Sequence, residues 1–369
     1  MNILITGSEG FIAKNLIELL KRANYTDLFL FHRETTDLEL ETFIQHSDFI
    51  FHLAGVNRPE TVNEFYEGNS DLTQKIITLI EKHNRKIPIL FTSSTQAVTD
   101  NDYGKSKHTA EVFIQNYSHK NDVSTYIYRL PNVFGKWGKP NYNSVISTWC
   151  HNITRDLPLQ INDPTKTLDL VYIGDVVSHF LHQLHNNSHS CDYYNIQPVY
   201  QKSLGEINQL LEQFKISRNN LLIPKVGQGF ERALYATYLS YLPENAFSYE
   251  LKGHKDDRGT FYEILKTVDS GQFSLSTTKP GITRGNHYHN TKNEKFLVVK
   301  GEALIELRNI YSDEVIKYYV SDKKIEVVEM IVGYTHNITN IGDEEMILLI
   351  WANEVFDPQS PDTNFLAVQ

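Results

Sequence analysis

The chain has 369 residues, which is too long for one ordinary hydrophobic core and predicts two domains. Hydrophobic residues make up 40% of it without low-complexity tracts, so both domains should be globular. The net charge of −10 and the lack of a basic cluster argue against a protein that follows nucleic-acid phosphates. We therefore predict no nucleic-acid partner.

Three further features concern the compartment of the protein. No apolar run approaches the roughly 20 residues needed to cross a bilayer, which predicts no membrane partner. The first predicted strand begins at residue 2 without a basic leader, so we expect a cytoplasmic protein. Cys150 and Cys191 form no Cys-x-x-Cys pair and are interpreted as ordinary core thiols.

The beginning of the chain combines a strand, a glycine turn and a helix. Residues 2–6 form an apolar run typical of a buried parallel strand, and the turn Gly7-x-x-Gly10-x-x-Ala13 follows at once. Apolar residues then recur at helical spacing, which places the glycines at the positive end of a helix, where a diphosphate fits. The residues predicted to bind the cofactor there are Gly7, Ser8, Glu9, Gly10, Phe11 and Ile12. An ordinary structural turn is the alternative.

The next two predicted strands add further cofactor contacts. Residues 28–32 form the second strand, where His32 and Arg33 offer donors that suit the 2′-phosphate of NADP(H) better than the ribose hydroxyl of NAD. The acidic Glu34 follows, and a solvated loop charge is the alternative for Arg33. Residues 49–53 form the third strand, whose end should lie near the nicotinamide half of the cofactor. The residues expected there are Leu53, Ala54 and Gly55.

A helix over 69–82 and a strand over 87–92 continue the alternation, which predicts an α/β fold with a doubly wound, Rossmann-type parallel sheet. Thr95, Tyr103 and Lys107 follow that strand. Tyr103 and Lys107 share one face of a helix, so the ammonium group should lower the pKa of the phenol toward working pH. Thr95 can hold a substrate oxygen in line with the phenol, and a surface Tyr–Lys pair is the alternative.

Residues 1 to about 245 resemble the extended short-chain dehydrogenase/reductase family. The matching stretches are the glycine turn, His52–Gly55, Asn69, the set Thr95, Tyr103 and Lys107, Arg129–Gly135 and Asp169–Asp175. The resemblance implies hydride chemistry on nucleotide sugars, with Tyr103 as general acid and base and Lys107 assisting it and binding ribose. It also implies that Thr95 orients the carbonyl and that Asn132 contacts the nucleotide sugar. Only eight positions separate Thr95 from Tyr103, fewer than is usual in the family, so Ser94 is the alternative to Thr95.

The helical pattern stops near residues 242–246, which predicts a reductase domain over 1–245 and a second domain over 246–369. The motif Gly281-x5-His287-x-His289-x4-Glu294 places two histidines on one strand face and returns Glu294 across a hairpin. The predicted ligands of Zn²⁺, or of another divalent transition metal, are His287, His289, Glu294 and His336. A metal-free histidine cluster is the alternative.

Residues 247–369 resemble the cupin superfamily, whose fold is an all-β barrel or jelly roll, and within it the nucleotide-sugar 4-keto 3,5-epimerases. The matching stretches are Asp256–Glu263, Gly281–His287 and Gly333–His336. The resemblance implies that a histidine at position 287 lifts a proton from the carbon beside a ketone and that Arg258 belongs to the substrate site. These epimerases generally lack a histidine at 289 and a metal. They also carry a tyrosine proton donor where this chain has Leu349-Ile-Trp351.

The fusion of the two domains resembles bifunctional enzymes of capsular-polysaccharide synthesis. It implies that the second domain inverts C3 of a UDP-2-acetamido-2,6-dideoxy-4-hexulose and that the first then reduces C4 with NADPH. The expected product is UDP-2-acetamido-2,6-dideoxy-L-talose, on the route to UDP-N-acetyl-L-fucosamine. Epimerisation must come first, because the C3 proton is no longer acidic once C4 is an alcohol. We expect a homodimer or higher homo-oligomer by analogy.

Three alternatives remain open. The first alternative is a plain NADPH-dependent 4-keto-sugar reductase whose second domain only binds metal or dimerises. The second alternative is a dehydratase or epimerase that retains NAD and returns the hydride. A metal-cupin dioxygenase is the third, although the stretch Arg258–Glu263 favours sugar nucleotides.

Overall fold

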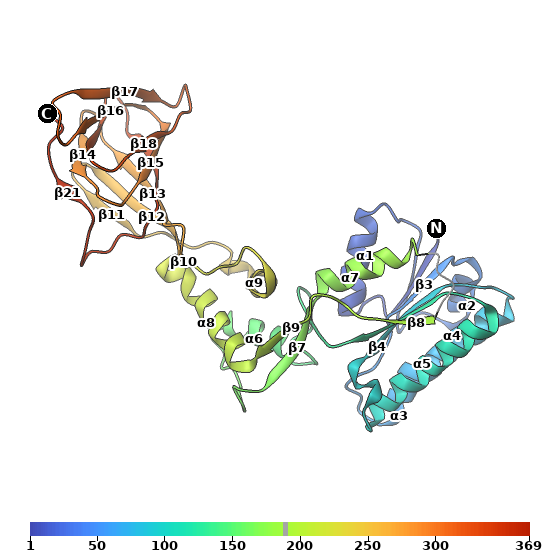
Figure 1. Ribbon diagram of the computed structural model, residues 1–369. Coiled ribbons are helices and arrows are strands. Elements are labelled where there is room, and N and C mark those ends of the chain that lie inside the picture. The colour runs from blue at the N-terminus through green and yellow to red at the C-terminus, as the bar shows by residue number, and fades with distance from the viewer. Residues whose placement is uncertain (187–190) are drawn as a thin grey trace. The chain divides into compact units, whose positions relative to one another are not determined.

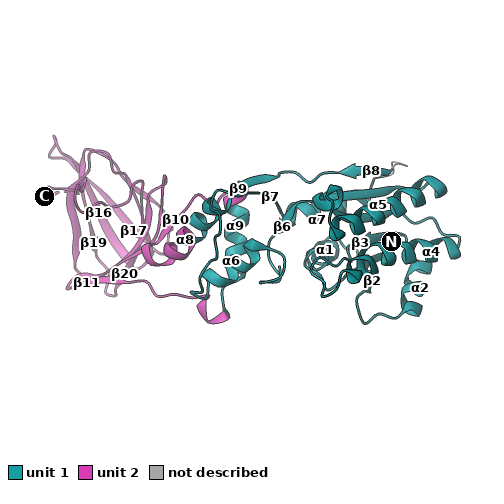
Figure 2. Cartoon of the chain, turned by 90° about the horizontal axis from the view of Figure 1, so that it is seen from below, with its two compact units in different colours: residues 1–211, 232–243 teal, residues 212–231, 244–369 magenta. Residues whose placement is uncertain are grey.

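The computed structural model describes residues 1–186 and 191–369. These residues form two compact units, shown in Figure 2. The first unit comprises residues 1–211 and 232–243, and the second comprises residues 212–231 and 244–369. Two helices contribute residues to both units, α8 (Leu204–Asn220) and α9 (Gly229–Ser240). Within the described ranges, no helix is both long and apolar enough to cross a membrane.

The first unit is built on a six-stranded sheet (Figure 1). Its strands in spatial order are β2 (Leu28–Phe31), β1 (Ile3–Thr6), β3 (Phe49–His52), β4 (Ile89–Ser94), β5 (Thr125–Leu130) and β8 (Cys191–Tyr194). Every neighbouring pair runs parallel, which confirms the predicted parallel sheet. The chain leaves β1 for β2 on one side and returns to β3 on the other. The carboxyl ends of β1 and β3 therefore flank the switch point where such sheets bind ligands.

Helices cover both faces of this sheet (Figure 1). Side chains of Ile3 and Ile5 pack into one hydrophobic cluster and Leu4 into the other, because successive residues of a strand face opposite sides. The helices are α1 (Phe11–Arg22) and α7 (Ile173–Gln183) on the first face, and α2 (Asp37–His46), α4 (Leu72–Lys82) and α5 (Asp102–Asn121) on the second. The helix predicted from residue 69 begins as the π-helical turn η1 (Tyr66–Asp71), preceded by α3 (Asn63–Phe65).

Smaller elements complete the first unit. A three-stranded sheet consists of β6 (Asn132–Phe134), β7 (Thr167–Tyr172) and β9 (Tyr200–Ser203), in that order. β6 runs parallel to β7, and β9 runs antiparallel to it. The short helix η2 (Thr95–Val98) connects β4 to α5, and α6 (Val145–Ile153) lies between β6 and β7 in the chain. Through β6, the small sheet carries one predicted substrate residue, Asn132.

The second unit is rich in strands, as predicted, and its described strands form two sheets rather than one closed barrel. The larger sheet contains β10 (Leu222–Ile223), β11 (Gly253–Asp256), β12 (Gly259–Thr267), β13 (Gln272–Thr278), β15 (Glu294–Lys300), β18 (Val328–Met330) and β20 (Met346–Ala352). The smaller sheet contains β14 (Thr283–Tyr288), β16 (Glu302–Asn309), β17 (Val315–Ser321), β19 (Tyr334–Asn340) and β21 (Asn364–Phe365). The short helix η3 (Glu244–Ala246) lies between β10 and β11 in the chain. One hydrophobic cluster joins the sheets, with Phe296 and Leu348 from the larger and Ile305 and Ile338 from the smaller.

Candidate functional site

The switch point of the parallel sheet brings the glycine turn to the end of β3. Gly7 has a φ of +66°, and a Cβ on it would lie 2.8 Å from the Cα of Ala54, so glycine lets the two backbones approach this closely. The N–H of Gly10 donates to the carbonyl oxygen of Gly7 at 2.8 Å and closes the turn. The predicted cofactor residues of the turn thus lie at the same edge of the sheet as Leu53, Ala54 and Gly55.

The helix that follows the turn begins without a side-chain cap. Gly10 is the N-cap of α1, and the first turn of the helix, which includes Phe11 and Ile12, contains no acidic residue. The first N–H groups of a helix have no partner within the helix and favour an anion. Together with Ser8 and Glu9 of the turn, this end of α1 fits the diphosphate of a dinucleotide.

His32 and Arg33 follow β2 at the same edge. The N–H of Ser8 donates to the carbonyl oxygen of Phe31 at 3.1 Å, which fixes the end of β2 beside the turn. The backbone N–H of His32 donates to the hydroxyl of Thr35 at 3.0 Å, whereas Arg33 is exposed. An exposed guanidinium group can form charge-assisted hydrogen bonds with a phosphate.

His52, the last residue of β3, is a buried residue to which sequence patterns assigned no role. Its Nδ1 lies 2.8 Å from the hydroxyl of Thr6, and its Nε2 lies 2.8 Å from the hydroxyl of Thr73. Thr73 donates to the carbonyl oxygen of Asn69, so it accepts from Nε2–H of His52 and Thr6 donates to Nδ1. Burial, with the charge of Lys107 adding to it, lowers the pKa of His52 to about 3. The ring is therefore a neutral link between the strand ends and α4.

Lys107 lies in the buried part of α5, beside the end of β3. Its Nζ donates to the carbonyl oxygen of Thr92 at 3.0 Å. A Cβ on Gly55 would lie 2.9 Å from this Nζ and equally close to Oδ1 of Asn69, so the glycine leaves room for both polar groups. Burial lowers the pKa of Lys107 to about 8, and the carboxylate of Glu111 opposes that shift.

Tyr103 stands one helical turn before Lys107 on α5, so the two share a helix face. Burial raises the pKa of Tyr103, and a hydrogen bond with the side chain of Ser94 opposes the shift. The prediction that a neighbouring ammonium group lowers this pKa is therefore wrong, because loss of solvent raises it by more than the hydrogen bond with Ser94 lowers it. The phenol is held in its protonated form, which can donate a proton.

Ser94, rather than Thr95, is the hydroxyl that contacts Tyr103. Ser94 ends β4, is buried, and accepts a hydrogen bond from the N–H of Gln96 at 3.1 Å. Thr95 begins η2 and is exposed. The geometry favours Ser94, the alternative raised by the short spacing to Tyr103, as the residue that orients a substrate oxygen.

Glu111 is a second buried residue that sequence patterns missed. The Nε and Nη2 atoms of Arg129 donate to its carboxylate at 2.9 and 2.6 Å, and the hydroxyls of Ser93 and Tyr193 donate as well. Burial raises the pKa of Glu111, but Arg129 and Ser93 outweigh this and hold it below its ordinary value. Because Ser93 and Arg129 lie on β4 and β5, the network fixes the part of α5 that carries Lys107.

The two predicted substrate residues lie in different units. Asn132 on β6 is exposed, and its Nδ2 donates to the carbonyl oxygen of Asp169 at 3.1 Å. Arg258 precedes β12 and donates to Asp256 from Nε and Nη2 at 2.9 and 2.6 Å, which lowers the pKa of Asp256 to about 2. Arg284 lies 3.4 Å from the same carboxylate. Two guanidinium groups around one carboxylate leave a positive charge that suits a phosphate.

Four side chains of the second unit converge on one point. His287 lies on β14, His289 directly after it, Glu294 at the start of β15 and His336 on β19. One ligand atom from each lies within 4.8 Å of the others. The buried Nε2 atoms of His289 and His336 lie 3.4 and 3.5 Å from Oε2 of Glu294, and neither has a hydrogen-bond partner among the described residues. This donor set fits a divalent cation.

The ligands reach this point from both sheets. The prediction that Glu294 returns across a hairpin is wrong, because β14 and β15 belong to different sheets. A bulge at Asn286, with a φ of +61°, sets His287 opposite His336 of β19. Burial, with the rings of His336 and His289 adding to it, lowers the pKa of His287 to about 4. The imidazole is therefore neutral, the form that binds metals.

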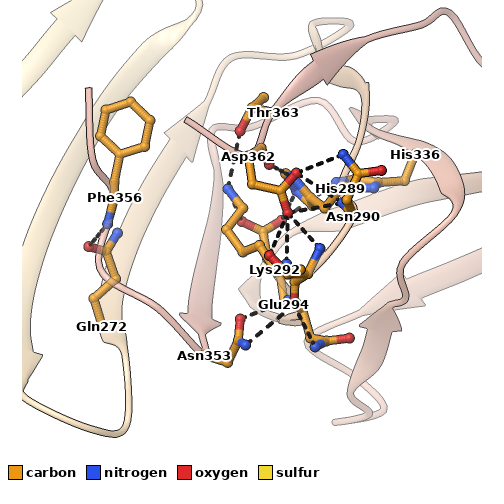
Figure 3. Close-up of polar contacts among 12 residues, drawn as sticks. Gln272, His289, Asn290, Lys292, Glu294, His336, Asn353, Phe356, Asp362 and Thr363 are labelled. Atoms are coloured by element: carbon orange, nitrogen blue, oxygen red, sulfur yellow. Dashed lines mark hydrogen bonds and ion pairs between the residues drawn. The ribbon is translucent and has the colours of Figure 1, made fainter. Parts of the chain in front are cut away.

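Asp362 holds the loop between His289 and Glu294 (Figure 3). Its carboxylate accepts hydrogen bonds from three consecutive backbone N–H groups, those of residues 290–292, at 2.6 to 3.0 Å. Burial raises the pKa of Asp362, but these amides outweigh it and hold the pKa well below its ordinary value. No sequence motif marks this contact.

The family of the chain follows from its N-terminal half. Residues 3–196, more than half of the chain, match the model of the NAD dependent epimerase/dehydratase family. The chain belongs to this family. Residues 254–364 of this epimerase/dehydratase member match a second model, described as the polysaccharide biosynthesis C-terminal domain. The family description agrees with a nicotinamide cofactor.

Relatives of this epimerase/dehydratase member match it along its whole length. It is 48% identical over 363 residues to the UDP-2-acetamido-2,6-beta-L-arabino-hexul-4-ose reductase of Pseudomonas aeruginosa, a match that covers 98% of each chain. The crystal structure of the capsular polysaccharide assembling protein CapF from Staphylococcus aureus shares 47% identity and a TM-score of 0.93, with 100% of both chains covered. CapF with the inhibitor 3-isopropenyl-tropolone matches at 43% identity and a TM-score of 0.89, again over 100% of both chains. These similarities confirm the predicted resemblance to capsular-polysaccharide enzymes.

Proposed function

We propose that this chain reduces a UDP-linked 4-keto sugar with NADPH, after its second domain has inverted C3 of the same sugar. The observation that carries the reductase step is the set of Tyr103, Lys107 and Ser94 at the same edge of the sheet as the glycine turn. The printed name of the Pseudomonas aeruginosa relative, a reductase of a UDP-linked hexul-4-ose, supports this substrate class.

The residues of the first unit have distinct roles in the reduction. When bound, NADPH supplies the hydride that reaches C4 of the sugar. Tyr103 donates its phenolic proton to the C4 oxygen, and its raised pKa keeps that proton available before the reaction. The hydroxyl of Ser94, or that of Thr95, donates to the same oxygen and orients it. The ammonium group of Lys107 binds the ribose and stabilises the phenolate, which then recovers a proton from solvent.

The preference for NADPH over NADH rests on His32 and Arg33. Both follow β2, where the adenosine ribose of a dinucleotide lies in sheets of this type. Their donors form charge-assisted hydrogen bonds with a 2′-phosphate, whereas a free 2′-hydroxyl is usually met by an acidic residue. Glu34 is exposed beside them and is the residue that would favour NAD instead.

The second domain is proposed to be a cupin-type epimerase. Its two packed sheets are compatible with a jelly roll, and His287, His289, Glu294 and His336 would hold Zn²⁺ or another divalent transition metal. When bound, the ion supplies a positive charge that favours the enolate left when the C3 proton departs. Arg258 contacts the phosphates. The inhibitor named with CapF supports a metal, because tropolones carry a ketone beside a hydroxyl, an oxygen pair that binds divalent ions.

The predicted product requires inversion at C3. The relative's printed substrate has the L-arabino configuration, whereas the 4-keto form of L-talose has the L-lyxo configuration. These two ketones differ only at C3. Inversion followed by reduction therefore leads to the predicted UDP-2-acetamido-2,6-dideoxy-L-talose, while reduction alone leads to an L-altro or L-ido sugar.

A plain reductase is the second candidate. The relative's printed name mentions reduction and no epimerisation. In addition, Trp351 lies on the strand where related epimerases carry their tyrosine proton donor, and its indole N–H donates to the carbonyl oxygen of Ser270 at 3.0 Å. In this case the second domain serves only metal binding or dimerisation. The homodimer itself stays a prediction, which sedimentation of the full chain tests.

One NMR experiment separates the two candidates. The full chain is incubated in D₂O with a UDP-linked 2-acetamido-2,6-dideoxy-L-arabino-4-hexulose, first without coenzyme and then with NADPH or NADH. We expect deuterium at C3 before coenzyme is added, and an L-talo product once NADPH is present. A product with an L-altro or L-ido configuration and protium at C3 leaves the reductase proposal intact and refutes the epimerase. No product with either coenzyme refutes the reductase.

A further inference from the structure

The last described segment of the chain runs along the four converging side chains. Its residues 362–369, called here the 362–369 strap, include β21, which pairs with β14 so that Phe365 lies opposite His287. Further along, the N–H of Leu366 donates to the carbonyl oxygen of Asn286 at 3.0 Å. The hydroxyl of Thr335 donates to the carbonyl oxygen of Leu366. The strap therefore contacts both the bulge before His287 and the residue before His336.

The strongest attachment of the strap is made by Asp362. Besides the three backbone N–H groups of residues 290–292, its carboxylate accepts from the hydroxyl of Thr291 at 3.0 Å and from Nδ2 of Asn290 at 3.1 Å. Figure 3 shows these contacts gathered on the one carboxylate. The loop that they hold contains only four residues between His289 and Glu294. Fixing its backbone fixes the distance between those two side chains.

The backbone of Asp362 also determines which ring nitrogen of His289 faces the cluster. The carbonyl oxygen of Asp362 accepts a hydrogen bond from Nδ1–H of His289. Nε2 is then the nitrogen that faces the cluster, and it lies buried 3.4 Å from Oε2 of Glu294 without a hydrogen-bond partner among the described residues. A hydrogen bond to the distal nitrogen is the usual way in which proteins orient a metal-binding imidazole.

We propose that the 362–369 strap, with Asp362 as its principal positioning residue, holds His289 and Glu294 in the arrangement that binds the metal. This inference rests on the proposed metal site and assigns Asp362 no contact with the ion or the substrate. A strap of this kind raises metal affinity because it holds the ligands in place before the ion enters. Binding then does not cost the entropy of ordering them.

Metal affinity of the full chain tests the proposal without reference to turnover. We compare the unchanged protein with Asp362→Asn, using competition against a chromophoric chelator for Zn²⁺ and the visible spectrum of bound Co²⁺. Asparagine keeps the size of the side chain but loses the charge and half of its acceptors. We expect the dissociation constant for Zn²⁺ to rise about 10- to 100-fold and the Co²⁺ bands to change. Asp357→Asn is the matched control, because Asp357 is exposed and, among the described residues, its carboxylate accepts a hydrogen bond only from the N–H of Gln359.

Each outcome bears on a different statement. Equal Zn²⁺ affinity and an unchanged Co²⁺ spectrum in Asp362→Asn overturn the positioning role. No metal uptake by the unchanged chain refutes the metal site instead, which is part of the proposed function. If Asp362→Asn does not fold, Thr335→Val decides, since it removes only the hydroxyl that holds Leu366. We expect it to weaken Zn²⁺ binding about threefold to tenfold, and unchanged affinity there also overturns the proposal.

Discussion

The two sites of this chain bury opposite charges, and this difference indicates what each one binds. In the first unit a buried cation, Lys107, lies beside the neutral His52 near a helix end that is also positive. In the second unit the buried Glu294 lies among the imidazoles of His289 and His336 and 3.3 Å from Nζ of Lys292, and its pKa is held well below its ordinary value. Burial raises that pKa, but the contacts with His289 and His336 lower it by more than burial raises it. The first site is thus suited to an anionic cofactor and the second to a cation.

The two sites also differ in how the chain assembles them. The first takes Tyr103 and Lys107 from one turn of α5 and its remaining groups from the ends of neighbouring parallel strands. The second takes ligands from two sheets and fixes them with Asp362, whose bonds to the loop span 70 to 72 residues of sequence. If both sites are catalytic, a change in one should leave the chemistry of the other measurable.

Tyr103→Phe gives the largest expected effect. Removing the phenolic proton should slow NADPH oxidation about 10³-fold, because the general acid proposed for the C4 oxygen is lost. Deuterium exchange at C3 should continue at the normal rate, since it depends on the second unit. Both rates are measured on the same preparation, by nicotinamide absorbance and by NMR in D₂O. Tyr311→Phe is the control, because Tyr311 is 94% exposed. Loss of both reactions would contradict independent sites.

His287→Asn tests whether the second site can be disabled without affecting the first. Asparagine cannot replace the imidazole as a metal ligand or as a base, so exchange at C3 should fall about 300-fold. The variant should still oxidise NADPH normally when it is given a ketone already in the L-lyxo configuration. His119→Asn, on the exposed end of α5, is the matched control. Unchanged exchange at C3 would leave the second unit without a catalytic role.

Sequence patterns predicted the first site better than the second because its determinants are local. The glycine turn, the strand ends and the pair Tyr103 and Lys107 follow from spacings of a few residues. Burial does not follow from spacing, so the raised pKa of Tyr103 was predicted with the wrong sign. The choice between Ser94 and Thr95 depends on where β4 ends, and strand ends are poorly defined by sequence.

For the second site, the pattern of residue types identified the four converging side chains but not how they are held. Glu294 lies in a different sheet from His287, and Asp362 forms its hydrogen bonds with a distant loop. Both features depend on tertiary contacts between segments far apart in the chain. The periodicity of apolar residues in the sequence does not predict such contacts. The metal, the preference for NADPH and the homodimer stay predictions.

Paired alanine variants decide between the two hydroxyls at the end of β4. Ser94→Ala should slow NADPH oxidation about 100-fold, because a buried donor beside Tyr103 is lost from the developing oxyanion. Thr95→Ala should have less than about a twofold effect, because an exposed hydroxyl is replaced by solvent. Each variant serves as the control for the other. The reverse ranking would restore Thr95 as the orienting residue.

A smaller effect than that of Ser94→Ala is expected from a pH dependence set by Lys107. Burial lowers its pKa to about 8, so the amine loses its proton as the pH rises through that value. NADPH oxidation at saturating substrate should then fall about tenfold between roughly pH 7 and roughly pH 9, because the neutral amine no longer stabilises the phenolate of Tyr103.

The titration of Lys107 cannot lower the reaction rate by unfolding the chain. Between the folded pKa and the ordinary value of 10.5, the unfolded state binds more protons at Lys107, so this lysine makes the folded chain more stable as the pH rises. Thermal unfolding measured across the same range separates the two effects, and a reaction rate that stays constant to the upper end of the range would mean that Lys107 keeps its proton.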